Sequence, residues 1–133
     1  MKRIRAIIFI ILSVLIIAAI SAVMGYRTIE ANLERLEDME IKKIDLSRVA
    51  DGTYTGSCQV FPVSAEVRVT VKDGRIASIK LVEHKNGRGT AAEIITDRVV
   101  RAQTSEVDII SGATYSSKVI LKAIENALDS AGK

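Results

Sequence analysis

The hydrophobic pattern begins with one long apolar segment. Residues 6–24, AIIFIILSVLIIAAISAVM, form a run of 19 residues without a charge. At about 1.5 Å per residue, a helix of this length measures roughly 28 Å, close to the hydrocarbon thickness of a bilayer. The run therefore predicts a membrane-spanning helix that anchors the chain. A cleaved signal peptide is the alternative, although its apolar region is usually shorter, about 7–15 residues.

A strictly alternating pattern follows in the middle of the chain. From Val63 to Lys72 apolar and polar residues alternate, which predicts a strand with one buried and one wet face. Asp73-Gly74 predicts a two-residue hairpin turn, after which residues 76–82 return as the partner strand. A further strand is predicted near residues 53–60. Together these strands form an antiparallel meander whose apolar face must be covered.

Two helical patterns supply that cover. Residues 91–103 and 117–128 place apolar side chains at helical spacing, and residues 106–110 between them fit a short strand. Within the first strand, Gly52 and Gly56 permit a turn or a bulge. The predicted fold class is therefore α+β: a small antiparallel sheet with two helices packed on one face, preceded by a transmembrane helix.

These patterns divide the chain into four parts. We expect a basic tail (residues 1–5), the anchor (residues 6–24), a charged helical stalk (residues 25–50) and one domain (residues 51–133). A short coiled-coil contact is the alternative role for the stalk, although its apolar pattern is brief.

Charge gives the anchor an orientation. Lys2, Arg3 and Arg5 precede the apolar run, whereas the other 16 of 19 Lys and Arg follow it together with all 16 acidic residues. The positive-inside rule then places the N-terminus in the cytoplasm and the domain outside the cell membrane, in a single-pass topology. The net charge of +3 resides in the tail, and the neutral remainder argues against binding of nucleic acid.

The chain is poor in groups for acid–base or metal chemistry. It has one cysteine, Cys58, and one histidine, His84. These exclude an internal disulfide and a Cys/His metal site, and leave no Ser-His-Asp array with a spare base. Cys58 is expected to be a half-buried strand residue.

Two polar segments remain as candidate binding elements. EHKNGRGT, residues 83–90, is either a surface connection or a loop whose glycines allow close approach to a ligand. The hydroxyl-rich turn of residues 111–117 lies just before the last predicted helix. Its hydroxyls can cap that helix, and the same place attracts anions such as phosphate. The pattern alone leaves both interpretations open.

The last of these segments resembles a known motif. DIISGAT, Asp108 to Thr114, followed by two serines and an amphipathic helix, resembles the covalent flavin-attachment motif of the FMN-binding domain family. That family includes the FMN-carrying subunits of the Na⁺-translocating NADH:quinone reductase and of the ferredoxin-linked Rnf complexes. The resemblance covers residues 51–128, and DGTYTG at residues 51–56 supports it.

The resemblance implies a role for each position of the motif. Thr114 would bear FMN through a phosphoester bond, formed by a separate FAD:protein FMN transferase that takes FMN from FAD with Mg²⁺. Gly112 and Ala113 would keep the loop slim, while Asp108 and Ser111 would serve transferase recognition or loop shape. The remaining hydroxyls are expected to be helix caps or phosphate neighbours: Ser116 and Ser117.

Contacts to the flavin ring are less well defined by the resemblance. Larger relatives carry a Glu-Thr-Pro-Gly-type loop, where this chain has EHKNGRGTAAE without the proline. Glu83, His84, Asn86 and Gly87 are the expected ring contacts. Tyr115 is either a further contact or a partly exposed aromatic residue.

The resemblance favours a membrane-anchored flavoprotein that relays electrons outside the cytoplasm. Its partners would be the lipid bilayer and a membrane redox complex, linked to quinone or ferredoxin, and it would carry electrons rather than catalyse a reaction alone. One alternative is a sensory or accessory module that holds FMN or another phosphorylated ligand. The other is a purely structural anchored domain.

Overall fold

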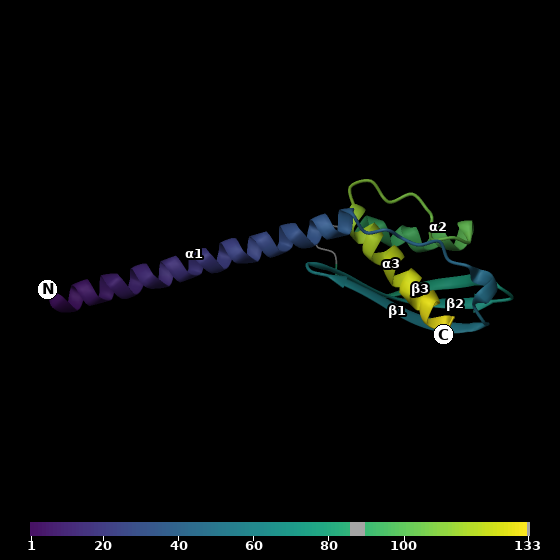
Figure 1. Cartoon of the computed structure of the whole chain (residues 1–133), viewed down its shortest axis with the longest axis horizontal. Helices are drawn as coiled ribbons and strands as arrows, with labels where there is room; N and C mark the ends of the chain where they lie inside the picture. Colours follow the sequence, from purple (N-terminus) through teal and green to yellow (C-terminus); the bar gives the residue numbers. More distant parts are fainter. Residues whose placement is uncertain (86–89, 133) are drawn as a thin grey trace. The chain divides into compact units, whose positions relative to one another are not determined.

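Helix α1 (Lys2–Glu37) begins the chain in the computed structural model, which describes residues 1–85 and 90–132 (Figure 1). The chain forms two compact units, Met1–Asn32 and Leu33–Lys133. In the first unit the side chains of the apolar run, residues 6–24, are exposed. An 18-residue window of α1 has a mean hydropathy of 3.1 and no buried share. By length and composition this helix is long and apolar enough to cross a membrane, as the sequence predicted.

The second unit is an α+β fold built on a three-stranded antiparallel sheet of order β1-β2-β3. Its elements in chain order are η1 (Leu46–Arg48), β1 (Gly52–Val60), β2 (Val63–Lys72), β3 (Arg75–Lys85), η2 (Thr90–Ile94), α2 (Ile95–Ala102) and α3 (Thr114–Ala131). Helix α3 packs against β1 and β2, and α2 packs against β3. The predicted fold class is confirmed.

The central strand β2 follows its alternating sequence. Val67, Val69 and Val71 are buried with the other apolar residues of β2, whereas the intervening side chains lie on the wet face. Asp73 (φ 52°) and Gly74 (φ 69°) both adopt positive φ between β2 and β3. Positive φ at both central residues is the type I′ geometry that suits the twist of a hairpin, so the predicted turn is confirmed.

The pairing of the edge strand β3 with β2 contains two register shifts that the sequence pattern does not predict, and one of them lies near His84. Glu66 pairs with Glu83 and Val67 pairs with Leu81, which leaves Val82 as an extra, bulged residue. Successive side chains of a strand point to opposite faces. The bulge therefore places His84, rather than Glu83, opposite the buried residue Ala65.

Gly56 brings the sheet and the last helix close together. A Cβ atom at Gly56 would lie 2.2 Å from the carbonyl oxygen of Ala123 and 2.3 Å from the backbone nitrogen of Ala127. Strand β1 keeps an unbroken register with β2 through this position. The turn or bulge that Gly56 would permit does not form, and the glycine instead lets α3 contact the strand backbone.

Three helical and extended segments differ from the sequence prediction. The predicted helix of residues 91–103 is divided into η2 and α2, and it ends at Gln103 (φ 55°), whose side-chain amide binds both backbone groups of Ile76. The predicted strand of residues 106–110 does not form. Its backbone bonds instead to side chains: Arg98 donates to the carbonyl of Asp108, and Ile110 donates to Ser117. Helix α3 begins at Thr114, earlier than predicted.

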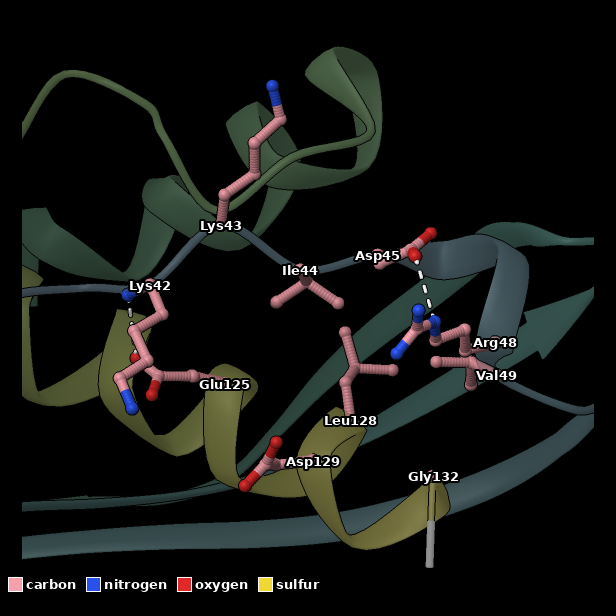
Figure 2. A pocket seen from close by; sticks show the side chains of 10 residues that line it. All are labelled: Lys42, Lys43, Ile44, Asp45, Arg48, Val49, Glu125, Leu128, Asp129 and Gly132. Carbon is pink, nitrogen blue, oxygen red and sulfur yellow. Dashed lines mark hydrogen bonds and ion pairs between the residues drawn. The ribbon is translucent and has the colours of Figure 1, made fainter.

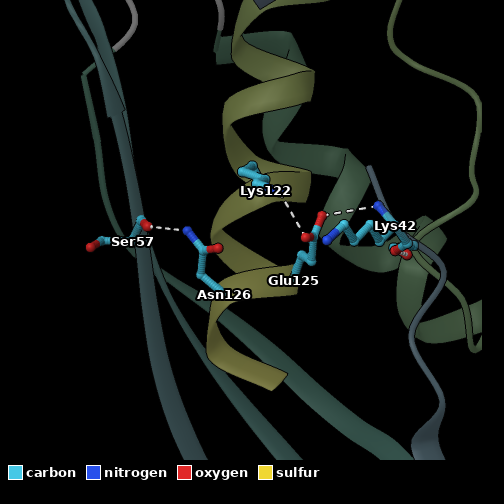
Figure 3. A network of polar contacts seen from close by, with 6 residues as sticks. Lys42, Ser57, Lys122, Glu125 and Asn126 are labelled. Carbon is cyan, nitrogen blue, oxygen red and sulfur yellow. Dashed lines mark hydrogen bonds and ion pairs between the residues drawn. The ribbon is translucent and has the colours of Figure 1, made fainter. Parts of the chain in front are cut away.

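The predicted helical stalk is helical only as far as Glu37. Residues 38–45 run without regular structure, and the backbone of Lys42 is bonded on both sides. Its N–H donates to Glu125 Oε2 (3.0 Å), and its carbonyl accepts from the buried Ser105 hydroxyl (2.8 Å). Figure 3 shows Glu125 on α3 between Lys42 and Lys122. This segment belongs to the domain because its backbone bonds to the domain.

Candidate functional site

The turn before α3 is fixed at both ends and exposed at its tip. Ala113 N–H donates to the Ile110 carbonyl (3.0 Å), and both residues are buried. Between them, Ser111 and Gly112 are exposed. Gly112 has φ +78° and Ser111 has no positive φ, which is the type II geometry that favours glycine at the third position. Gly112 is thus required for its backbone conformation, and it also leaves the tip free of a side chain.

Thr114 follows this turn as the first residue of α3. Its side chain is half-exposed, and its hydroxyl makes no hydrogen bond with any residue that the structure describes. The N-cap residue, Ala113, provides no side-chain cap. The first amides of a helix lack intrahelical acceptors and carry the positive end of its dipole. The Thr114 hydroxyl, which makes no hydrogen bond with a described residue, therefore lies at the N-terminus of α3, where negative charge is stabilised.

The two serines that were expected to be helix caps or phosphate neighbours follow Tyr115 in the sequence. Ser116 and Ser117 lie inside the first turn of α3 and are buried. Ser117 Oγ accepts a hydrogen bond from the backbone N–H of Ile110 (3.1 Å). The hydroxyl of Ser117 is therefore committed to the preceding turn, whereas that of Thr114 is not.

Two further residues of α3 connect the site to the last turn of α1. Tyr115 Oη donates to Glu37 Oε1 (3.3 Å), and Lys118 Nζ donates to the Glu37 carbonyl. Partial desolvation, then the Glu37 carboxylate and this hydrogen bond, raise the pKa of the Tyr115 phenol. Lys118 is four residues after Thr114, so it lies on the same face of the helix. The sequence analysis missed Lys118, although this spacing identifies it, and missed Glu37, which no local pattern identifies.

Asp108 and Ser111 lie on the exposed side of the turn. Arg98 Nη1 donates to the backbone carbonyl of Asp108 (3.1 Å), which ties the start of the motif to α2. The Asp108 and Ser111 side chains are exposed and make no hydrogen bond within the described part of the chain. They are thus accessible to a second protein.

The predicted ring contacts do not form one group. The His84 side chain is only 2% exposed, and its Nδ1 lies 3.2 Å from Glu93 Oε1 in η2, an element that also packs against α3. Glu83 lies on the opposite, wet face and pairs with Lys85 at 3.1 Å. Glu83 and His84 therefore cannot contact the same face of one flavin. Asn86 and Gly87 lie outside the described residues.

Cys58 and His84 do not form a catalytic pair. Both pair with Ala65, one from each side of β2, so a whole strand separates them by about 9–10 Å. Burial raises the pKa of the Cys58 thiol, which keeps it a weak nucleophile. The half-buried strand position predicted for Cys58 is confirmed.

A pocket of about 340 Å³ lies near the other end of α3, distant along the helix from Thr114 (Figure 2). Basic and acidic side chains both line this pocket, and Arg48 Nε lies 3.3 Å from Asp45 Oδ2. The backbone N–H of Lys42 and the side chain of Lys122 already bond to Glu125. The residues that line it are Lys42, Lys43, Ile44, Asp45, Arg48, Val49, Glu125, Leu128, Asp129 and Gly132. Mutual neutralisation makes this pocket a poor site for a phosphate.

The residues around Thr114 are compatible with a phosphate-bearing group. The site combines an accessible hydroxyl, the start of an 18-residue helix and an amine one turn along the same face. Among the described residues no cluster of His, Cys, Asp and Glu could hold a metal ion.

Comparison with known proteins agrees with this geometry. Residues 63–129 match the family model of the FMN-binding domain. An uncharacterized protein of Treponema pallidum is 32% identical over 104 residues, covering 76% of this chain and 29% of the relative. NADH:acrylate oxidoreductase of Vibrio harveyi is 30% identical over 115 residues, covering 83% of this chain and 12% of the relative. Urocanate reductase of Eggerthella lenta is 33% identical over 82 residues, covering 59% of this chain and 14% of the relative. The chain thus spans less than a third of these relatives.

Proposed function

The chain belongs to the FMN-binding domain family, and we propose that it carries FMN covalently, through a phosphoester bond to Thr114. The observation that carries the proposal is the hydroxyl of Thr114, half-exposed and uncommitted at the start of α3. Other hydroxyls nearby are less suitable. Ser117 is buried and hydrogen-bonded, Ser116 is buried, and Ser111 lies on the turn before the helix begins.

Charge supports the same position. A phosphodiester retains one negative charge, which the free amides of the first helical turn stabilise. Lys118, on the same face, is the basic side chain placed to balance it. Its amine already bonds to the Glu37 carbonyl, which holds it over that face.

We further propose that the domain lies outside the cytoplasm on a membrane anchor. The apolar run of α1 is long enough to span, and the basic residues that precede it favour a cytoplasmic N-terminus. A separate FAD:protein FMN transferase would attach the flavin, as the resemblance to this family implies. A covalent bond suits this location, since a dissociated cofactor would be lost from the cell.

The bound FMN would serve electron transfer. Flavin supplies one- and two-electron chemistry, while the protein attaches and orients it. Two relatives are named as an NADH:acrylate oxidoreductase and a urocanate reductase, which are redox enzymes much longer than this chain. A chain with one domain and few acid–base groups is suited to the carrier part of such a system. We propose a membrane redox complex, linked to quinone or ferredoxin, as its partner.

Intact mass tests the attachment. The full chain, coexpressed with a flavin transferase and purified from membranes, should gain the mass of one FMN less one water. Thr114→Ala should abolish the gain, whereas Thr114→Ser, which keeps a hydroxyl, should retain it. Full flavinylation of Thr114→Ala would assign the bond to another residue.

A second measurement tests the electron relay. In membrane vesicles, the flavin absorbance of the loaded protein should bleach when a quinol or reduced ferredoxin is added, and recover with an oxidant. Flavin that stays oxidised with both donors, but is reduced by dithionite, would favour a sensory or accessory module.

A further inference from the structure

The hydroxyl of Ser117 bridges the turn that precedes Thr114. Ser117 is 0% exposed, and its Oγ accepts from the backbone N–H of Ile110 at 3.1 Å. The backbone N–H of Ser117 donates to the Ala113 carbonyl (2.9 Å), the residue at the other end of the turn. One serine thus bonds to both ends of the turn, by its side chain and by its backbone.

The hydrogen bond from the Ile110 N–H to Ser117 Oγ satisfies a backbone donor that has no acceptor within the turn. Within the turn, the Ile110 carbonyl accepts from Ala113, but the Ile110 N–H points out of it and needs another acceptor. No neighbouring strand supplies one, because residues 106–110 are not in the sheet. The bond to Ser117 is buried, so bulk solvent does not serve as the acceptor. The Ser117 hydroxyl is therefore what the Ile110 end of the turn depends on.

We propose that Ser117 is a positioning residue for flavin attachment, which rests on the proposed function of Thr114. With the bridge formed, Ile110 and Ala113 stay buried, the Ser111-Gly112 tip projects, and Thr114 leads the helix with its hydroxyl exposed. A transferase can act only on the fraction of molecules that present this arrangement. Loss of the bridge lowers that fraction, and the apparent rate falls in proportion.

Ser117→Ala tests the proposal, with Ser116→Ala as the matched control. Ser116 is the preceding buried serine, and its hydroxyl makes no hydrogen bond among the described residues. Both full-length variants are incubated with purified transferase, FAD and Mg²⁺ below their melting temperatures, and flavinylation is followed by intact mass. We expect kcat/KM to fall about tenfold for Ser117→Ala, equivalent to about 1.4 kcal/mol, and less than twofold for Ser116→Ala.

Amide hydrogen exchange of the unmodified proteins provides a readout that needs no flavin. The Ile110 amide should exchange at least about tenfold faster in Ser117→Ala than in Ser116→Ala or the unaltered chain, because its acceptor is gone. Ser117→Thr keeps the hydroxyl and should restore slow exchange, with flavinylation recovering in parallel.

The outcomes separate the two proposals. Faster Ile110 exchange with an unchanged flavinylation rate would show a structural bond without a positioning role, and unchanged exchange would refute the bridge itself. If the unaltered chain accepts no flavin, the proposed function fails and the positioning role fails with it, while Ile110 exchange still decides whether the bridge exists.

Discussion

Gly56 is a residue at which the sheet and the helix that carries the site approach closely. An added Cβ would meet the backbone of Ala123 and Ala127 at 2.2 and 2.3 Å, and backbone atoms cannot move aside as a flexible side chain can. We predict that Gly56→Ala lowers the free energy of unfolding by about 3 kcal/mol, the upper range for overpacking. Urea unfolding followed by circular dichroism measures the loss.

The neighbouring position on β1 offers the control for Gly56. Thr55 is exposed on the wet face, so Thr55→Ala should change the free energy of unfolding by less than about 0.5 kcal/mol. Similar losses in the two variants would mean that β1 is sensitive to substitution in general, rather than through its contact with α3.

The sequence pattern pointed to Thr114 but did not predict the residues that contact its neighbours. The motif DIISGAT located the turn and pointed to Thr114 as the proposed acceptor, because these residues are consecutive in the chain. Glu37 contacts Tyr115 from 78 positions away, so no local pattern can associate them. Ser117 was expected to be a helix cap or a phosphate neighbour since serine favours helix starts, whereas its hydroxyl accepts a bond from the Ile110 N–H.

At the scale of elements, segment 38–45 is held to α3 by one carboxylate. Glu125 accepts from the Lys42 backbone N–H at 3.0 Å and from Lys122 Nζ at 2.7 Å, and it is buried. We predict that Glu125→Ala lowers the free energy of unfolding by about 2 kcal/mol, because it leaves the Lys42 N–H without its partner. Segment 38–45 should also become the first site of limited proteolysis.

Asp129 provides the comparison for Glu125. It lies one turn further along α3, is exposed and makes no ion pair with the described residues. Asp129→Ala should leave both the unfolding free energy and the proteolysis rate within experimental error. Equal protection of segment 38–45 in all three proteins would show that apolar packing alone holds it.

Elements with a clear hydrophobic periodicity were predicted well, whereas elements whose structure depends on contacts between residues distant in the sequence were not. Strand β2 and its type I′ turn follow from alternation and from Asp73-Gly74. The bulge at Val82 reverses the orientation of every later residue of β3, so the inward position of His84 could not be read from the period. Residues 106–110 resemble a strand by composition, but they pair with neither edge strand of the sheet, β1 or β3.

For the whole molecule, the compact unit begins at Leu33, earlier than the sequence suggested. Leu36 is 0% exposed in the core, and Lys42 bonds to Glu125 and Ser105. We predict that a fragment of residues 33–133 unfolds cooperatively. A fragment of residues 51–133, which lacks a buried leucine, should melt at least about 10 °C lower. Thermal circular dichroism of the two fragments measures this difference.

Equal melting temperatures of the two fragments would place the folding boundary at Asp51. A cysteine-free version of each fragment, Cys58→Ala, controls for oxidation of the single thiol during heating.

The hydrogen bonds at Glu37 also limit how far the site can lie from the end of the proposed membrane anchor. Glu37 follows Met24, the end of the uncharged run, by 13 positions, which span about 20 Å as a helix and roughly 45 Å fully extended. Tyr115, beside Thr114, bonds to Glu37 itself, so this bound applies to the site in any orientation of the domain. With the anchor inserted, a cofactor on Thr114 would search a thin layer at the membrane surface. A partner in the same membrane would meet it within that layer, so the encounter rate would depend on the surface densities of the two proteins and on the thickness of the layer.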